Sequence, residues 1–533
     1  MKQAYLNEMK KVYFIGISGT TMAPLAKAFK DMGWQVTGSD QKKVYPPIST
    51  YLEKNNIVYF KGYREENVPR DADLVIVGYG ALLINSQNPE YYLAKKLGLT
   101  VKSYPEVLKE FLVKENSVVV AGTYGKTTIS SLLSWILTKG GLNPSYMTGG
   151  VSLNLIDGVK LSDSNYSVVE GDEVPALKET DPPKFMFYKP KYLILTATKH
   201  DHPEIYKTKE DYLKAFSELV KLLPPDGLLV YNFDSVDEAV IKEAKCRKVS
   251  YSLTNKQADY FVKDISIGKE ITDFTVQTPK ETIPLTTILI GKHNLENICG
   301  AVALCKEISI EVGVIKGGVE EFKGVKTRLE FLGKIGDRFL YRDFAQHPEK
   351  VRGSLEALRE HFPTKKIFCI FNPATTGLKY KESLSWFKGA FDQADEVIVG
   401  KVTFLKSIDK KERVTGKDIS EAISQTQKNV FYNRFANCTE VVKRLKAYAY
   451  NRFANCTEVV KRLKAYAYNR FAVESLSEKT LGLQPRVAYE PIDEKIISYL
   501  ITKTKNGDVI VFMSSGGLRF TNLIQETINK LKD

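Results

Sequence analysis

One stretch of the chain, SVVVAGTYGKTTISS at residues 117–131, has the residue types and spacing of a phosphate-binding loop. The β-branched run from Val118 to Val120 predicts a buried parallel strand, and the glycines that follow it allow a tight turn. A lysine and two threonines then begin a predicted helix that continues to Leu137. In such a loop the backbone N–H groups and the helix N-terminus hold the anion, the lysine reaches the outer phosphates, and the threonine hydroxyl can bind Mg²⁺.

This loop predicts a site for ATP or a similar nucleotide. The strict pattern has a further glycine where this chain has Val120, so the loop is of the shorter GTYGKTT form. An ordinary glycine-containing turn is the alternative, but the Lys-Thr-Thr sequence directly after the glycine and the strand before the loop favour phosphate binding. The predicted nucleotide-binding residues of the loop are Gly122, Thr123, Gly125, Lys126, Thr127 and Thr128.

Carboxylates and histidines follow two further predicted strands. A strand from Tyr166 ends in EGDE at residues 170–173, and a strand from Tyr192 leads into KHDH at residues 199–202. Carboxylate oxygens near bound phosphates are the ligands that Mg²⁺ needs, although a solvated strand end is the alternative. Histidines at strand and loop ends favour ligand or catalytic roles over core packing, and four of the five histidines lie at such places: His200, His202, His293 and His347.

The first residues of the chain contain a second candidate ligand loop. A strand from Lys11 runs into GISGTT at residues 16–21, and a helix and a second strand follow, at 35–38, next to Asp40. This is a Rossmann-like βαβ start, in which an acidic residue about twenty positions after the loop lies where a ribose hydroxyl would bind. The GxxG pattern disfavours a nicotinamide dinucleotide, and a purely structural turn is the alternative. The candidate binding residues are Gly16, Ser18, Gly19, Thr20 and Asp40.

Strands and helices alternate along the whole chain of 533 residues, which predicts an α/β protein of three domains. We expect a Rossmann-like N-terminal domain at 1–111, a central P-loop ATPase-type α/β domain at 112–325 and a Rossmann-like C-terminal domain at 326–533. The strands expected in the last domain lie at 339–342, 366–371, 396–399 and 508–512, and the glycine-rich sequence MSSGG follows the final strand at 513–517. Ligands bind to α/β sheets at such strand ends.

An 18-residue sequence, YNRFANCTEVVKRLKAYA, occurs twice in direct succession at 432–449 and 450–467, and a third copy breaks off after Ala472. Its period of about five helical turns would let a helix continue in register. Perfect identity between the copies indicates a recent duplication or an assembly artefact rather than a functional arm. The two copies contribute +6 of the formal net charge of +14, so the charge of the remaining chain is modest.

The composition is typical of a soluble globular protein, with 43% hydrophobic and 26% charged residues. The basic residues are scattered and not interleaved with stacking aromatics, which disfavours nucleic acid and favours an anionic substrate. No apolar run reaches the length of a membrane span, and the N-terminus lacks the apolar core of a signal peptide, so we expect a cytoplasmic protein with reduced thiols. Cys299 and Cys305 lie in a helical pattern and are predicted core residues. The sequence does not predict an oligomeric state.

Taken in order, the motifs resemble those of the Mur ligase family of bacterial cell-wall synthesis over nearly the whole chain outside the repeat. The stretches that carry the resemblance are GTYGKTT, EGDE at 170–173, Asp201-His202, LPPDGLLVYN at 223–232, GKHNLEN at 291–297 and GVKTRLE at 324–330. Three further stretches resemble the branch of the family that joins UDP-N-acetylmuramate to a tripeptide: VYPPIST at 44–50, KF at 184–185 with YKP at 188–190, and VFMSSGG at 511–517.

The resemblance implies an ATP-dependent amide ligase of peptidoglycan recycling, with ATP and Mg²⁺ as cofactors. In this family, ATP phosphorylates the lactyl carboxylate of UDP-N-acetylmuramate, and an amine attacks the acyl phosphate. The implied amine is that of L-alanyl-γ-D-glutamyl-meso-diaminopimelate. Addition of L-alanine in de novo synthesis is the first alternative. A non-catalytic UDP-muramyl-binding protein is the second, and a folate-type ligase is disfavoured by the UDP-binding type of N-terminal domain.

The resemblance also implies roles for individual residues. Lys126 would neutralise charge on the migrating phosphoryl group, Thr127 and Glu170 would hold one Mg²⁺, and His202 would help to hold a second. The loop from Gly16 would take the UDP diphosphate. The residues implied to face the nucleotide from elsewhere are His293, Asn294, Asn297 and Arg328, and those implied near the incoming amine are Asp343 and His347.

The chain departs from the family pattern at several positions. The family usually has Asn and Glu before its Asp-His pair, where this chain has Ala197 and Lys199. It usually has Asp and His where this chain has Arg342 and Gln346, and a loop histidine where this chain has Tyr124. These differences concern the identity of the amine substrate more than the phosphate chemistry, because Lys126, Thr127, Glu170 and His202 are all present.

Overall fold

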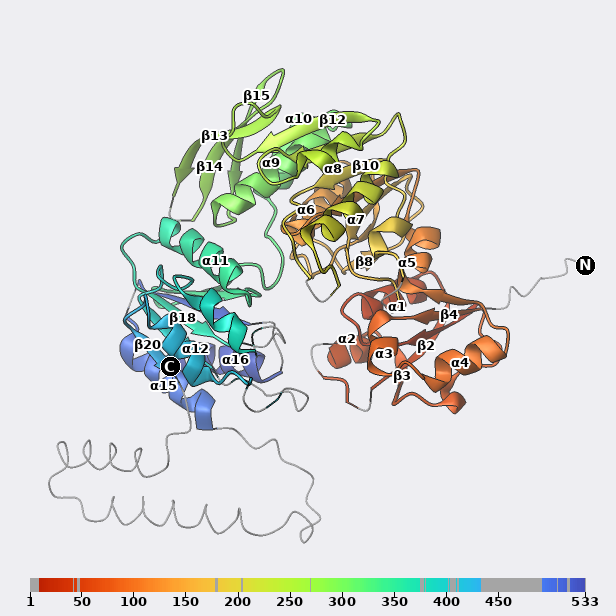
Figure 1. Cartoon of the computed structure of the whole chain (residues 1–533), viewed down its shortest axis with the longest axis horizontal. Coiled ribbons are helices and arrows are strands. Elements are labelled where there is room, and N and C mark those ends of the chain that lie inside the picture. The colour runs from red at the N-terminus through yellow and green to blue at the C-terminus, as the bar shows by residue number, and fades with distance from the viewer. Residues whose placement is uncertain are drawn as a thin grey trace, which may run out of the picture.

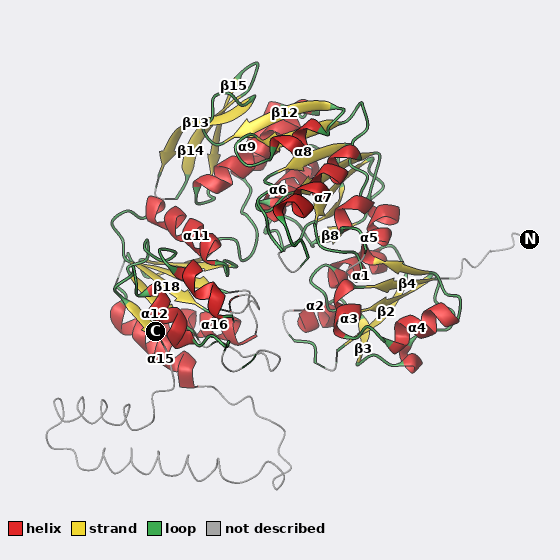
Figure 2. Ribbon diagram, viewed as in Figure 1, coloured by secondary structure: helices red, strands yellow, loops and turns green. Residues whose placement is uncertain are grey.

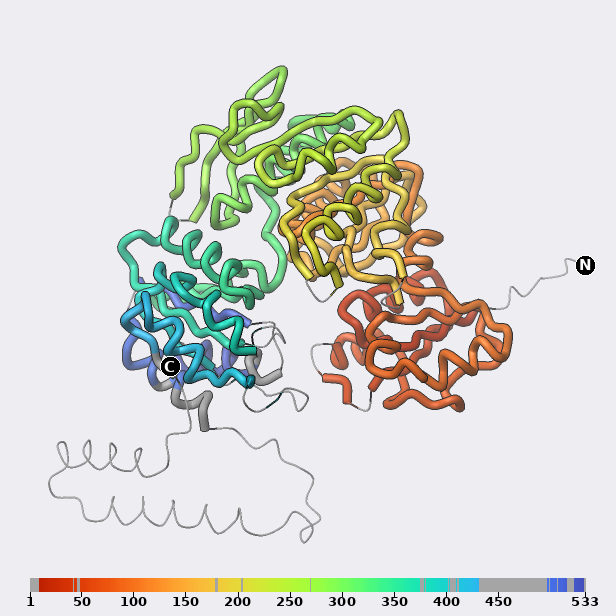
Figure 3. Tube along the Cα trace, viewed as in Figure 1, coloured from red at the N-terminus to blue at the C-terminus, as the bar shows by residue number. Residues whose placement is uncertain are grey.

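The computed structural model describes residues 9–532 except for the repeat region and short internal segments. The undescribed residues are 1–8, 42, 46–47, 178–180, 203–204, 269, 374–377, 379, 401, 403–408, 410–411, 433–490, 506, 515–517 and 533. The repeat at 432–472 beyond Tyr432, over which a helix could continue, and the glycines of the loop at 513–517 therefore lie outside the described residues. Figure 1 shows three lobes, with the central one (yellow to green) between the N-terminal lobe (red to orange) and the C-terminal lobe (cyan to blue). Each lobe is a contiguous part of the chain, as the trace in Figure 3 shows.

The N-terminal lobe is a parallel sheet of five strands in the order β3-β2-β1-β4-β5. Its strands are β1 (Lys11–Ile15), β2 (Gln35–Asp40), β3 (Val58–Lys61), β4 (Leu74–Val77) and β5 (Val101–Ser103). Its helical segments are α1 (Met22–Asp31), α2 (Ile48–Lys54), η1 (Glu65–Asn67), α3 (Tyr79–Ile84), α4 (Pro89–Lys96), α5 (Tyr104–Val107) and η2 (Leu108–Leu112). Strand order reverses at β1, so the loop after β1 opens at the edge where α/β sheets bind ligands.

The central lobe has a sheet of ten strands in the order β15-β14-β13-β12-β11-β10-β6-β9-β7-β8. Its strands are β6 (Asn116–Ala121), β7 (Ser145–Met147), β8 (Val159–Lys160), β9 (Tyr166–Gly171), β10 (Tyr192–Leu195), β11 (Leu228–Asn232), β12 (Arg247–Ser252), β13 (Tyr260–Ile267), β14 (Thr272–Gln277) and β15 (Thr282–Thr287). Its helical segments are α6 (Lys126–Lys139), η3 (Lys184–Phe187), α7 (Lys209–Lys221), α8 (Glu238–Lys242), α9 (Lys292–Glu307) and α10 (Val312–Glu320). The middle strands are parallel, and β14 runs antiparallel to both of its neighbours, β13 and β15.

The C-terminal lobe has a sheet of six strands in the order β16-β17-β21-β18-β19-β20. Its strands are β16 (Glu330–Ile335), β17 (Arg338–Asp343), β18 (Ile367–Phe371), β19 (Glu396–Val399), β20 (Val430–Tyr432) and β21 (Val509–Met513). Its helical segments are α11 (Pro348–His361), η5 (Lys381–Phe387), α12 (Gly416–Ile423), α15 (Pro491–Lys503) and α16 (Leu518–Lys532). All neighbouring strands are parallel except β16 and β17.

Strand β6 shows why the continuous apolar run of the central sheet forms a buried strand. Val118 and Val120 belong to one hydrophobic cluster, and Val119 and Ala121 belong to another on the opposite face. Because helices cover both faces of the parallel sheet, alternate side chains on both sides are fully buried. Figure 2 shows the helices against the sheet of each lobe.

The α/β class and three domains predicted from the sequence are confirmed. The predicted strand from Tyr166 ends at Gly171, so Asp172 and Glu173 lie in the loop beyond it. Cys299 and Cys305 are buried in α9, as expected. No helix in the described part of the chain combines the length and apolar character needed to cross a lipid bilayer.

Candidate active site

The phosphate loop joins the end of β6 to the beginning of α6, as predicted. Gly122 and Gly125 have φ angles of +124° and +76°, which L side chains rarely adopt. A Cβ at Gly122 would lie 2.3 Å from Thr196 Oγ1, and a Cβ at Gly125 would lie 2.3 Å from Asn297 Oδ1. The two glycines therefore allow the end of β10 and the first turns of α9 to pack directly against the loop.

Lys126 is held in place by two oxygen partners. Its Nζ donates to the carbonyl oxygen of Gly122 at 2.7 Å and to Glu173 Oε2 at 2.8 Å. Burial opposes the charge on Lys126, but Glu173 and Asp172 outweigh burial and raise the pKa of the ammonium. A permanently charged lysine is therefore available at the mouth of the loop, where an outer phosphate would bind.

Glu173 was not among the residues singled out from the sequence as ligands. Its carboxylate is almost fully buried, with 1% of the side chain exposed, and it pairs with Lys126. The available signal was its position in the EGDE stretch, but the sequence does not show which of the three carboxylates reaches the lysine. The pairing depends on the turn that follows β9.

Thr127 and Glu170 lie together beside the loop, as the predicted metal set requires. Thr127 Oγ1 donates to Glu170 Oε1 at 3.1 Å, and the N–H of Gly149 donates to Glu170 Oε2 at 2.7 Å. Burial raises the pKa of Glu170, and Lys126 partly opposes that rise. A hydroxyl and a carboxylate are hard oxygen ligands, so this pair suits Mg²⁺.

His202 lies in a second group with Glu173 and Asp201. One ligand atom of each residue lies within 4.8 Å of those of the other two, and His202 Nε2 is 3.6 Å from Glu173 Oε1. The φ angle of His202 is +57°, an uncommon conformation for a residue other than glycine. The three predicted metal ligands thus fall into two groups: Thr127 lies with Glu170, and His202 lies with Glu173 and Asp201. Lys126 donates a hydrogen bond to Glu173 of the second group. These donors fit Mg²⁺, which when bound would neutralise phosphate charge.

Helix α9 contributes asparagines from the far side of the loop. Asn297 approaches Gly125, and its Nδ2 lies 3.5 Å from Asn294 Oδ1. Asn294 in turn donates from Nδ2 to the carbonyl oxygen of Ile290 at 2.8 Å. His293, near the start of α9, is exposed. Of the residues expected to face the nucleotide from this helix, Asn297 packs against Gly125 of the loop.

Arg328 and Asp343 lie where the chain enters the C-terminal lobe. The guanidinium of Arg328 lies 4.7 Å from the ring centre of Phe344. Asp343 Oδ2 accepts from the N–H of Leu329 at 2.6 Å, and Oδ1 accepts from the N–H of Ala345 at 2.5 Å. Burial raises the pKa of Asp343 to about 6. In this structure the two oxygens of Asp343 therefore hold the backbone directly after Arg328 and two residues before His347.

Helix α11 brings side chains of the C-terminal lobe to the phosphate loop. His347 caps the helix, accepting from the N–H of Glu349 at 3.4 Å, and its ring centre is 5.2 Å from that of Trp386. Lys199 pairs with Glu349 across the lobes, at 2.9 and 3.1 Å. Lys350 Nζ lies 5.6 Å from the ring centre of Tyr124, a residue of the loop itself.

The predicted N-terminal ligand loop lines a cavity of about 330 Å³. The side chain of Asp40 contacts the loop, since its Oδ2 accepts a hydrogen bond from the backbone N–H of Ser18 at 2.7 Å. The cavity brings together all five residues predicted for this site, and the central lobe adds two more: Gly16, Ser18, Gly19, Thr20, Asp40, Ala176 and Lys184. It is therefore a composite cavity at the junction of the N-terminal and central lobes.

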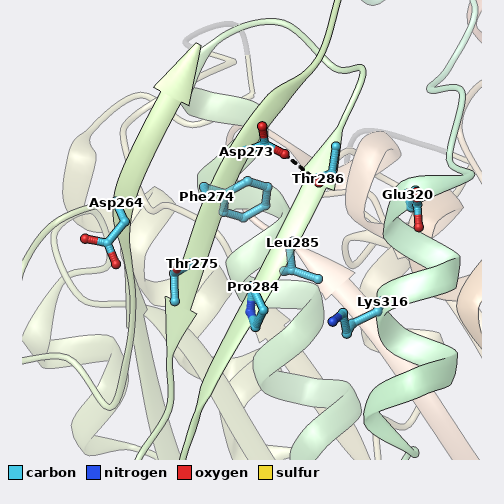
Figure 4. A pocket seen from close by; sticks show the side chains of 9 residues that line it. All are labelled: Asp264, Asp273, Phe274, Thr275, Pro284, Leu285, Thr286, Lys316 and Glu320. Carbon is cyan, nitrogen blue, oxygen red and sulfur yellow. Dashed lines mark hydrogen bonds between the residues drawn. The ribbon is translucent and has the colours of Figure 1, made fainter. Parts of the chain in front are cut away.

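A second cavity of about 370 Å³ lies at the outer end of the central sheet, between α10 and the antiparallel strands (Figure 4). Asp273 accepts from Thr286 there at 2.6 Å, Lys316 of α10 points toward the strands, and Glu320 of α10 also lines the cavity. None of the residues that line it belongs to the phosphate loop or to the carboxylate and histidine groups, so its larger volume does not make it the reactive site.

Three family models match consecutive parts of the chain. They are "Mur ligase family, catalytic domain" at residues 11–115, "Mur ligase middle domain" at 120–305 and "Mur ligase, glutamate ligase domain" at 327–454. A UDP-N-acetylmuramate–L-alanine ligase of Desulfatibacillum aliphaticivorans is 31% identical over 393 residues, which cover 73% of this chain and 82% of the relative. The chain belongs to the Mur ligase family. Members of the family are ATP-dependent ligases of peptidoglycan synthesis, so the chain is an ATP-dependent ligase.

Other Mur ligases are similar to this one at comparable distances. A Haemophilus influenzae protein named UDP-N-acetylmuramate–L-alanyl-γ-D-glutamyl-meso-2,6-diaminoheptandioate ligase is 30% identical over 396 residues, covering 73% of this chain and 85% of the relative. The crystal structure of a UDP-N-acetylmuramate–alanine ligase from Thermotoga maritima matches with a TM-score of 0.69 at 21% identity, over 98% of both chains. That structure supports the Mur ligase fold, while its amine substrate is a property of that protein.

Proposed function

We propose that this Mur ligase joins UDP-N-acetylmuramate to L-alanyl-γ-D-glutamyl-meso-diaminopimelate in peptidoglycan recycling. The γ-phosphoryl group of ATP passes to the lactyl carboxylate, which leaves ADP and an acyl phosphate. The peptide amine then attacks the acyl carbon and loses a proton, phosphate leaves, and an amide forms. Because ATP is the phosphoryl donor, we assign the reaction to the cytoplasm.

The side chains around the phosphate loop suit the first step. Lys126 supplies a fixed positive charge where the γ-phosphoryl group would lie, held by Glu173. Thr127 and Glu170, with His202 next to Glu173, are the residues that would hold Mg²⁺. Preorganised charges of this kind stabilise phosphoryl transfer without a covalent intermediate on the protein.

The observation that carries the choice of amine is the placement of Lys350 over Tyr124. Lys350 comes from α11 of the C-terminal lobe, and its charge interacts with those of Asp201, Lys126 and Arg328. A cation on this side of the loop favours an incoming substrate with additional carboxylates. The tripeptide carries several carboxylates distant from its reacting amine, whereas L-alanine has one beside it.

Addition of L-alanine is the second candidate. It is supported by the 31% identity to the L-alanine ligase of Desulfatibacillum aliphaticivorans, which is about equal to the 30% identity to the tripeptide ligase of Haemophilus influenzae. At such similar identities the overall resemblance does not distinguish the two amines, so the choice depends on the side chains that face the amine.

Phosphate release from ATP, Mg²⁺ and UDP-N-acetylmuramate tests the proposal when the tripeptide is compared with L-alanine. We expect a higher kcat/KM for the tripeptide, and Lys126→Ala is the control for release by a contaminant. A higher kcat/KM for L-alanine would establish the second candidate. Phosphate release with neither amine, from protein that still binds both nucleotides, would refute both.

A further inference from the structure

Lys184 of the central lobe lies at the cavity formed by the N-terminal ligand loop. Among the described residues that line this cavity, Lys184 is the only one with a positive charge, and Asp40 is the only one with a negative charge. The carboxylate of Asp40 is already bonded to the N–H of Ser18. An anion bound on the loop would therefore find one side-chain cation within the cavity, and that cation comes from the neighbouring lobe.

The backbone around Lys184 is fixed. The backbone N–H of Lys184 donates to the carbonyl oxygen of Val174 at 3.0 Å. The backbone N–H of Phe185 donates to the carbonyl oxygen of Asp172 at 3.2 Å. Phe185 is fully buried, with its ring centre 5.4 Å from that of Phe216. Lys184 thus begins the short helix η3 from a rigid base, and only its side chain projects to the cavity.

The Lys184 ammonium lies between the two lobes. Its Nζ donates to Asp172 Oδ2 at 2.7 Å and lies 5.9 Å from the ring centre of Tyr79, the first residue of α3 in the N-terminal lobe. α3 begins next to the ligand loop, since a Cβ at Gly16 would lie 3.1 Å from Ala81 Cβ. An ammonium has three donors, so Lys184 can keep Asp172 and bind a further anion on the loop side.

The same cavity is lined by a buried tyrosine. Tyr104 is 6% exposed, and its hydroxyl makes no hydrogen bond of normal length and angle within the described part of the chain. Thr21, which also lines the cavity, is the side chain that interacts with this hydroxyl, so a ligand oxygen would add to that interaction. Tyr104 and Lys184 both line the cavity, where the Tyr104 hydroxyl is shielded from solvent and the Lys184 ammonium is the donor for a ligand.

We propose that Lys184 is a substrate-binding residue of this ligase, binding the diphosphate of the nucleotide sugar from the central lobe while the N-terminal loop binds it from the other side. This inference rests on the proposed function, because it assumes that the cavity takes a nucleoside diphosphate sugar. The diphosphate is the anion favoured here, since Lys184 reaches α3 and the glycine loop, where backbone N–H groups also suit phosphate.

The test is UDP binding to the full chain, measured by calorimetry. Lys184→Met keeps the aliphatic stem but removes the charge, and we expect the affinity for UDP and for UDP-N-acetylmuramate to fall by the same factor, about ten- to a hundredfold. Lys184→Arg should stay within about threefold of the unmodified chain, because it keeps the charge. Lys209→Met is the matched control. Lys209 is the first residue of α7, its Nζ donates to Asp237 Oδ2 at 3.3 Å, and it does not line the cavity.

Three outcomes would overturn the inference in distinguishable ways. Unchanged UDP affinity with weaker binding of Mg²⁺·ADP would show that Lys184 only neutralises Asp172 beside the ATP site. Loss confined to UDP-N-acetylmuramate, with UDP affinity unchanged, would place the ammonium on the lactyl carboxylate instead. Failure of the unmodified chain to bind either uridine nucleotide would refute the proposed function as well, whereas the first two outcomes leave it standing.

Discussion

Gly125→Ala is expected to destabilise the central lobe by more than the strain of its backbone conformation. The φ angle of +76° costs an alanine about 1–2 kcal/mol. The added Cβ would also lie 2.3 Å from Asn297 Oδ1, and Asn297 is 9% exposed, so its amide has little room to move. Forcing extra volume into a packed site costs about 1–3 kcal/mol, which gives a total loss of about 2–5 kcal/mol.

Gly141 provides a matched control within the same lobe. Its φ angle is +78°, almost the same as at Gly125, but a Cβ there would meet no atom within 4 Å. Gly141→Ala therefore carries the backbone strain alone, about 1–2 kcal/mol. The double variant Gly125→Ala with Asn297→Ala removes the colliding amide and should be destabilised less than the sum of its two single substitutions.

The assay follows the fluorescence of Trp135 on α6 during urea unfolding. The chain has three tryptophans, so replacing Trp34 and Trp386 with phenylalanine leaves Trp135 as the reporter of the central lobe. ADP binding is measured in parallel, and we expect it to weaken at least about tenfold in Gly125→Ala and to be unchanged in Gly141→Ala. Equal losses of unfolding free energy in the two glycine variants would refute the collision with Asn297.

Four further predictions concern the charged side chains of the site. Lys126→Ala should lower the rate of phosphate release about a hundred- to a thousandfold while calorimetry shows unchanged binding of UDP-N-acetylmuramate; loss of sugar binding would contradict the separation of the two sites. Lys199→Glu should lower kcat/KM by about tenfold or less, because the ion pair between Lys199 and Glu349 is exposed. Adding Glu349→Lys restores the ion pair with its charges exchanged and should restore kcat/KM. A double variant as slow as the single one would show that this ion pair does not contribute to catalysis. Lys350→Met should lower kcat/KM about tenfold for the tripeptide and leave L-alanine unaffected, whereas equal losses for both amines would remove the argument for the tripeptide. The pKa of Asp343 is raised from 3.8 to about 6 in the folded state, so between these pH values the folded state holds a proton that the unfolded state has released. The free energy of unfolding of the unmodified chain therefore falls as pH rises through that window, and the destabilisation caused by Asp343→Asn should shrink by about 3 kcal/mol over it. A destabilisation that stays constant across the window in urea unfolding would contradict the assignment.

Local sequence was sufficient for the features that a few consecutive residues determine. The phosphate loop was predicted to within a few residues, because the β-branched run, the two glycines and the Lys-Thr-Thr sequence are contiguous. The strand from Tyr166 was predicted two residues too long, because its last acids belong to the turn that carries Glu173 towards Lys126. Periodicity does not show where such a turn begins.

Contacts between lobes were not predictable in the same way. The pairing of Lys199 with Glu349 joins residues 150 positions apart, and the packing of Asn297 against Gly125 depends on how α9 lies on the sheet. Asp343 was expected near the incoming amine, and the structure shows that both of its oxygens accept from backbone N–H groups. Whether it also serves the amine remains a prediction. The place of Lys184 at the N-terminal cavity likewise required the arrangement of the lobes.

The strand order of the C-terminal lobe has a consequence for how the chain is made. β21 lies between β17 and β18, although it is the last strand in sequence and follows the duplicated segment. A ribosome-bound chain that has emerged only as far as β20 would therefore expose two unpaired strand edges in the middle of this sheet. Such edges favour aggregation and pairing with other chains, so this lobe depends on late, long-range closure during synthesis.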